Sequence, residues 1–167
     1  MLCTVLMPLT EDSKSISLLV GIGGTLPLVA LALGSNGRSR QQSNSAAIAQ
    51  MLTEKIASVK ASTSPTLTIT DCTGASFTVS TTAPGGSSLT SSGDVDYTQT
   101  AVTNYQMLYT NCGTAGAQVV YDVRWNITQP STYAKLLTVS AKKWGSGTSP
   151  VYFSLPVTIR TLIGQGT

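Results

Sequence analysis

Two different periods of apolar residues divide the chain. From Ser15 to Gly37 no side chain is charged. At roughly 1.5 Å per residue such a helix would measure about 34 Å, enough to cross a hydrocarbon core of about 30 Å. The stretch predicts a membrane-embedded stem that stays on the protein. The alternative is a secretory signal peptide, whose apolar region is usually about 7–15 residues long and is removed.

A one-sided apolar stripe follows the stem. Apolar side chains recur there at spacings of four, four and three, at Ile48, Leu52, Ile56 and Val59. This is the period of a helix with one face to bury. Pro65 and the Ser-rich residues before it indicate the end of the helix. No proline lies between Pro27 and Pro65. We therefore expect stem and stripe to form one long helix that reaches about Lys60.

Beyond Pro65 the apolar period falls to two, which is typical of β-strands. Short strands are predicted over 66–70, 76–80 and 105–110. A loop rich in Gly, Ser and Pro separates the second of these from the third, over residues 81–96. Three longer alternating runs follow, over 119–128, 137–142 and 151–159. Short turns join them, at residues 129–132 and 145–148.

The three late strands predict an antiparallel meander with one apolar and one polar face. In the last of them the inward row is expected to be Val151, Phe153, Leu155, Val157 and Ile159. The apolar face needs a cover, and the helix stripe supplies one. We therefore expect an α+β fold in which a long N-terminal helix packs on an antiparallel β-sheet. Its parts are an atypical N-terminal segment (1–14), the stem continuing as an amphipathic helix (15–60) and a β-sheet head (61–167).

The composition favours an exported protein. Only 10% of the residues are charged, against roughly 25% in an average soluble protein, and Ser and Thr take the polar positions. In an oxidising compartment Cys72 and Cys112 are expected to pair, closing a loop of about 40 residues worth roughly 4 kcal/mol. Two unrelated free thiols are the alternative. The net charge of +3 is scattered, so the sequence predicts no nucleic-acid partner.

Candidate chemistry is sparse. The chain contains no histidine, the commonest general base and metal ligand. Asp94 and Asp96 could touch a cation, but the other oxygen ligands of a calcium loop are missing, so a solvated loop is favoured. We expect Trp125 in the core and Trp144 at its rim. With neither a nucleophile motif nor a carboxylate pair, the sequence predicts no enzyme, no cofactor and no metal site.

The run SNGRSRQQSNSAAIAQMLTEKI (35–56), placed after an apolar stem, resembles the N-terminal helix of type IV minor pilins, particularly the pilus-modification (PilV-like) family. Residues 121–128, 135–144 and 157–161 resemble late strands of the same family. The resemblance implies a pilin-like fold with Ile48, Leu52, Ile56 and Val59 packed on the sheet. It also implies a structural role, as a minor pilin or pseudopilin of a type IV pilus or the related type II secretion filament.

Partners and location follow from the same resemblance. It implies membrane lipid before assembly and other pilin subunits afterwards, both contacted through the N-terminal helix. The head would lie in the periplasm of a bacterium, below an inner-membrane anchor, and later on a cell-surface filament. The usual Gly-Phe-Thr-Leu-Ile-Glu processing motif is not found, and therefore we assign neither a cleavage site nor an assembly glutamate.

A second hypothesis is a membrane-anchored, exported β-rich binding or adhesion module. Its loop over 81–96 or its turn over 145–149 would contact a surface or ligand. The two hypotheses differ at residues 35–45, which are helical in a pilin and a flexible linker in an anchored module. They also differ in whether the helix stripe is buried against the sheet.

Overall fold

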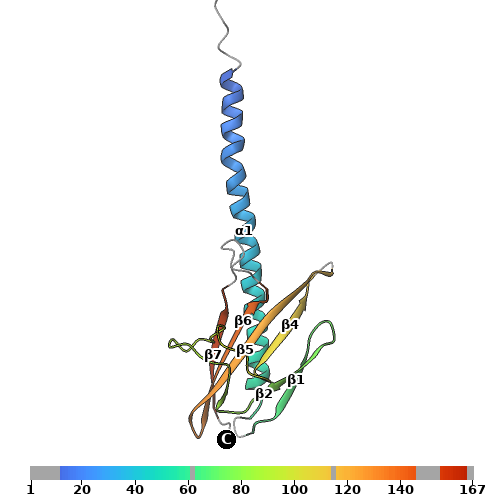
Figure 1. The fold of residues 1–167 in the computed structure, drawn as a ribbon, viewed down its shortest axis with the longest axis vertical. Coiled ribbons are helices and arrows are strands. Elements are labelled where there is room, and N and C mark those ends of the chain that lie inside the picture. The colour runs from blue at the N-terminus through green and yellow to red at the C-terminus, as the bar shows by residue number, and fades with distance from the viewer. Residues whose placement is uncertain (1–11, 61–62, 114–115, 146–154, 165–167) are drawn as a thin grey trace, which may run out of the picture. The chain divides into compact units, whose positions relative to one another are not determined.

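The computed structural model describes residues 12–60, 63–113, 116–145 and 155–164, with side chains from residue 35 onward. The helix α1 (Asp12–Ala57) comes first (Figure 1). The strands that follow are β1 (Thr66–Thr70), β2 (Ser76–Ser80), β3 (Gly85–Gly86), β4 (Gln106–Cys112), β5 (Gln118–Ser131), β6 (Ala134–Lys143) and β7 (Val157–Gly164). The chain divides into two compact units, residues 1–38 and 39–167. All that follows concerns the second unit unless stated.

The strands form two antiparallel sheets. β1 and β2 make a hairpin of their own, and the larger sheet has the order β3-β5-β6-β7, with β4 also paired to β5. β5 is the central strand, since β4 pairs with its first half and β3 with Asn126 and Ile127. Gly86 permits that last pairing. Its φ is 130°, and a Cβ there would meet the backbone of Asn126.

One face of the larger sheet carries the hydrophobic core. Every second residue of β5 from Tyr121 to Ile127 is buried there, facing the buried residues of β6. The helix contributes Ile48, Leu52 and Ile56 to the same cluster. Trp125 is fully buried at its centre, and its indole N–H donates to the Ser80 carbonyl at 3.0 Å. The bond ties the sheet to the end of β2.

The opposite face is covered as well, which the alternating pattern did not predict. The segment 87–105 crosses it, and the Arg124 guanidinium and the Asn126 amide donate to backbone carbonyls of Gln99 and Ser87 at 2.9 and 2.8 Å. Asp122, Thr138 and Ser140 are buried beneath this segment. The expectation of a half-buried meander with a solvated polar face is therefore wrong. The polar side chains pair with loop backbone instead of water.

The predicted fold class, an α+β pilin-like fold with a long N-terminal helix packed on the sheet, is also corrected. Only a short helical segment does the packing. Within the described side chains, residues 35–40 of α1 are exposed, and the buried ones are confined to Ser45–Ile56. The remainder is a β-rich antiparallel fold. The buried segment Ser45–Ile56 corresponds to about three helical turns.

Two further expectations fail at the ends of elements. α1 ends at Ala57 rather than near Lys60, so Val59 follows the helix and is only half-buried. The last strand begins at Val157, and Leu155 is 55% exposed rather than part of an inward row. Val151 and Phe153 lie outside the described residues.

The predicted stem (15–37) is helical from end to end. Its side chains before Ser35 lie outside those that the structure describes. Within the described part of the chain, no helix combines the length and apolar character needed to cross a membrane.

Candidate functional site

The predicted disulfide is confirmed. Cys72 lies in the turn after β1, and Cys112 is the last residue of β4, with their Cα atoms 5.9 Å apart. Asp71 shapes the turn: one carboxylate oxygen accepts bonds from the backbone N–H groups of Thr73 and Ala75. The other oxygen accepts the N–H of Thr110 in β4. The turn and β4 are thus joined by a covalent bond and a hydrogen bond.

The structure places the predicted helix face as follows. Ile48, Leu52 and Ile56 lie in the core, and Val59 lies at its edge. Ser45 and Ala49 are fully buried in addition, one turn apart. Both are small side chains on the buried face of the helix. Their spacing of four was visible in the sequence, but small residues carry little hydrophobic signal.

Asp94 and Asp96 do not form a joint site. Asp94 accepts a charged hydrogen bond from Arg160 of β7 at 2.9 Å. Asp96 accepts from the hydroxyl and the backbone N–H of Thr98, and these bonds lower the pKa of its carboxyl. Among the described residues, no three side chains of the metal-binding types come together. Both carboxylates stabilise the conformation of residues 87–105, the covering segment of the sheet.

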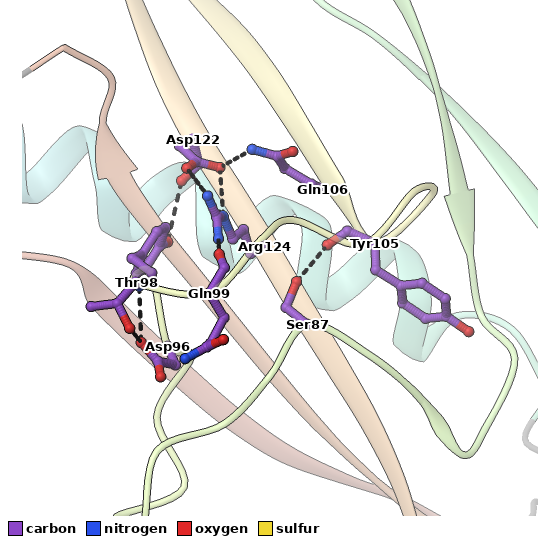
Figure 2. Close-up of polar contacts among 9 residues, drawn as sticks. Ser87, Asp96, Thr98, Gln99, Tyr105, Gln106, Asp122 and Arg124 are labelled. Atoms are coloured by element: carbon purple, nitrogen blue, oxygen red, sulfur yellow. Dashed lines mark hydrogen bonds and ion pairs between the residues drawn. The ribbon is translucent and has the colours of Figure 1, made fainter.

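A buried ion pair lies beneath that segment. The Asp122 carboxylate accepts from Nε and Nη2 of Arg124, the latter at 3.0 Å, and from the side-chain amide of Gln106 at 2.8 Å (Figure 2). Asp122 and Arg124 are two apart on β5, so they point to the same face. Because Gln99 also accepts from Arg124, the pair fastens the covering segment to the sheet.

The ring of Tyr97 packs against the pair and makes cation–π contacts with two cationic side chains. The Arg124 guanidinium carbon lies 4.9 Å from the ring centroid, and Nζ of Lys142 lies 4.2 Å from it. The phenol hydroxyl donates to the Asp122 carbonyl at 3.2 Å. Burial raises the pKa of Tyr97 and lowers that of Lys142. The hydroxyl therefore stays neutral, and the ammonium has lost part of its hydration.

Beside this cluster the surface is hollowed into an open depression of about 450 Å³. It is lined by Tyr97, Asp122, Arg124, Lys142, Lys143, Trp144 and Gly145. The lining carries three cationic groups and one carboxylate. Trp144 is 50% exposed. Aromatic and cationic side chains around an open hollow can hold a ligand that has both a negative charge and an apolar face.

Sequence reasoning found little of this depression. It placed Trp144 at the rim of the core, but it assigned no role to Tyr97 or Lys142. The spacing of two between Lys142 and Trp144 predicts a shared face once the strand is known. Nothing in the sequence near Tyr97 indicates that this loop residue packs on the sheet, because apolar residues do not repeat at a regular spacing in a loop.

Comparison with known proteins adds no relative. A scan against protein-family models, a search of the curated proteins and a search of the solved structures each find no match to this chain. The resemblance to minor pilins stays a prediction from the residues alone.

Proposed function

We propose that this chain is a structural, non-catalytic subunit of a type IV pilus or of the related type II secretion filament. In this role it is a minor pilin or pseudopilin. Its N-terminal helix lies in the bacterial inner membrane before assembly and contacts other subunits afterwards. The head is periplasmic first and then exposed on the cell-surface filament. The resemblance of residues 35–56 to minor pilins is the basis of this role.

The observation that carries the proposal is the helical backbone of residues 35–45. An anchored module would need a flexible linker there. The side chains from Ser35 to Arg40 are all exposed. A helix with exposed sides at this point has surface available for neighbouring helices. A few residues later, Ile48 and Leu52 fix the helix in the core of the head.

The disulfide supports the periplasmic location. Bonds of this kind form and persist in oxidising compartments and are rare in the cytosol. Cys72–Cys112 spans 40 residues of the head. Taken with the low content of charged residues, it favours a head that is exported.

Photo-cross-linking in filament-producing cells tests the proposal. A photoreactive amino acid is placed at Asn36 or Ser39, both exposed on α1. We expect covalent adducts with other filament subunits, and we expect them in sheared filaments as well as in membranes. The matched control is Tyr133, which is 71% exposed in the turn between β5 and β6 and should yield few such adducts.

The result that would contradict the proposal is equally concrete. If the helix positions give adducts with lipid alone, or if the same adducts persist in cells that lack the major filament subunit, the chain is not a filament subunit. The second hypothesis, an anchored and exported binding module, would then be favoured. The depression beside Tyr97 supports this alternative, because it could hold a ligand.

A further inference from the structure

We propose that the depression beside Tyr97 binds an acidic saccharide. In this arrangement a sugar carboxylate pairs with the Lys142 ammonium, and the C–H face of the ring lies on Trp144. The inference concerns the surface of the head and does not rest on the proposed filament role. Three properties of the described residues lead to it.

The first property is an ammonium group without an acceptor. Among the described contacts, the Lys142 ammonium has a cation–π contact with Tyr97 and neither a hydrogen-bond acceptor nor an ion pair, and the Asp122 carboxylate attracts it from nearby. The nearby Asp122 carboxylate is already engaged by Arg124 and Gln106. A partly desolvated cation next to a satisfied carboxylate can still accept an anion. An incoming carboxylate would receive charge-assisted hydrogen bonds, which are roughly twice as strong as neutral ones.

The second property is the placement of the tryptophan. Trp144 follows β6, two residues after Lys142, and its backbone N–H donates to the Val120 carbonyl at 2.8 Å. The bond continues the strand spacing, so both side chains point to the same face. Half of the Trp144 surface remains in water. A flat indole with one N–H donor suits a ligand that combines an apolar face with hydroxyl groups.

The third property selects the type of anion. Phosphate groups favour the bidentate fork of arginine. The Arg124 fork is used by Asp122 and the Gln99 carbonyl. Lys142, whose ammonium is described only in the ring contact, is instead a point charge that suits a single carboxylate. The depression, of about 450 Å³, is larger than a small anion needs and is open enough for one residue of a longer chain. Together these features indicate a uronic acid or a similar sugar acid.

The test is an NMR titration of the full chain, solubilised in detergent and labelled with ¹⁵N, with trigalacturonate as the probe. The chain has two tryptophans, and only Trp144 is exposed. We expect the indole N–H signal of Trp144 to shift saturably while that of the buried Trp125 stays unchanged. Lys142→Gln should weaken binding about tenfold or more, whereas Lys142→Arg should stay within about threefold of the wild type.

Controls separate the charge from the ring. Trp144→Ala, followed by the backbone amide signals of Lys142 and Gly145, should abolish binding, and Tyr133→Ala, a matched exposed aromatic in another turn, should leave it unchanged. Equal affinity for the neutral trisaccharide maltotriose would overturn the role of Lys142. Equal affinity for inorganic phosphate would overturn the saccharide assignment, and the absence of any saturable shift would overturn the site. None of these results bears on the cross-linking of α1, so the filament proposal is tested separately.

Discussion

At the scale of single residues, the buried charges of the head are held by hydrogen bonds or by an ion pair. Asp122 is fully buried, and its acceptor positions are filled by Arg124 and Gln106. A strand carrying Asp and Arg in alternation with Val and Trp is normally expected to turn these charges to water. Here the covering segment excludes water, and the ion pair replaces it.

Asp122→Asn tests how strongly the pair is needed. The substitution leaves the Arg124 guanidinium buried without its counter-charge, and breaking a buried pair in this way typically costs about 3–5 kcal/mol. We expect a loss at the lower end of that range, since Gln99 still accepts from Arg124. Chemical denaturation monitored by Trp125 fluorescence measures it.

The matched control is Asp94→Asn, which removes the partner of Arg160. That pair is exposed, with 42% and 50% of the two side-chain surfaces in water. Exposed pairs contribute about 0–1 kcal/mol. Equal losses from the two substitutions would show that burial of the Asp122 pair does not decide its importance.

Asp71 makes the stability of the head depend on pH in the acid range. The hydroxyl and N–H of Thr73, with the N–H groups of Thr110 and Ala75, lower the pKa of its carboxyl from 3.8 to about 2. Because the folded value lies below the unfolded one, the stabilisation is complete above about pH 4 and is lost as the pH falls toward 2. The melting temperature of Asp71→Asn should lie below that of the wild type at pH 6, and the difference should shrink toward pH 2. A difference that stays constant from pH 6 to pH 2 would contradict this assignment.

At the scale of elements, the helix segment Ser45–Ile56 and the large sheet share one core. Leu52 is fully buried in it, among side chains of β5 and β6. The segment is the last part of the longer helix α1. The packing of this face fixes it to the sheet.

Leu52→Ala is expected to cost about 3–4 kcal/mol, because it removes buried methyl groups and leaves a cavity. Lys55→Ala, on the exposed side of the same turn, should change stability by less than about 0.5 kcal/mol. Hydrogen exchange would follow both, and amides of Ser45–Ile56 should lose protection only in Leu52→Ala. Unchanged protection in that variant would mean that the helix is held by other contacts.

The same scale shows what the sequence could and could not predict. Alternation located the strands β1, β2, β5 and β6, because a strand with a buried face must repeat every two residues, but it placed the last strand over 151–159, whereas β7 begins at Val157. The stripe of Ile48, Leu52 and Ile56 located the helix face for the corresponding reason. The cover over Asp122 and Arg124 could not be predicted, since it is formed by a loop that pairs through backbone groups. The strand β3 was missed because it consists of two glycines.

At the scale of the whole head, two sheets are joined by a single covalent link between described residues. Cys72 belongs to the turn of the β1–β2 hairpin, and Cys112 ends a strand of the larger sheet. The bond closes a loop of 40 residues, which in the chain-entropy description stabilises the folded state by about 4 kcal/mol. It connects parts that would otherwise share only packing and a few hydrogen bonds.

The double substitution Cys72→Ser with Cys112→Ser should lower the free energy of unfolding by about 2–4 kcal/mol. Denaturation of the oxidised wild type and of the variant would measure the difference. Reduction of the wild type should reproduce the variant's curve. If the reduced wild type keeps its full stability, the two sheets are held together by packing alone.

The segment 87–105 has a consequence for how this head can change. It is fastened at a few points, by Asn126 to Ser87, by Arg124 to Gln99 and by Arg160 to Ser92. The side chains of Ser88 and Ser91, between these points, are exposed. Substitutions there can change the exposed surface of the head without disturbing the strands beneath it. Because its exposed positions can accept substitutions that the buried sheet cannot, this segment is the natural place for sequence variation and for inserting a tag.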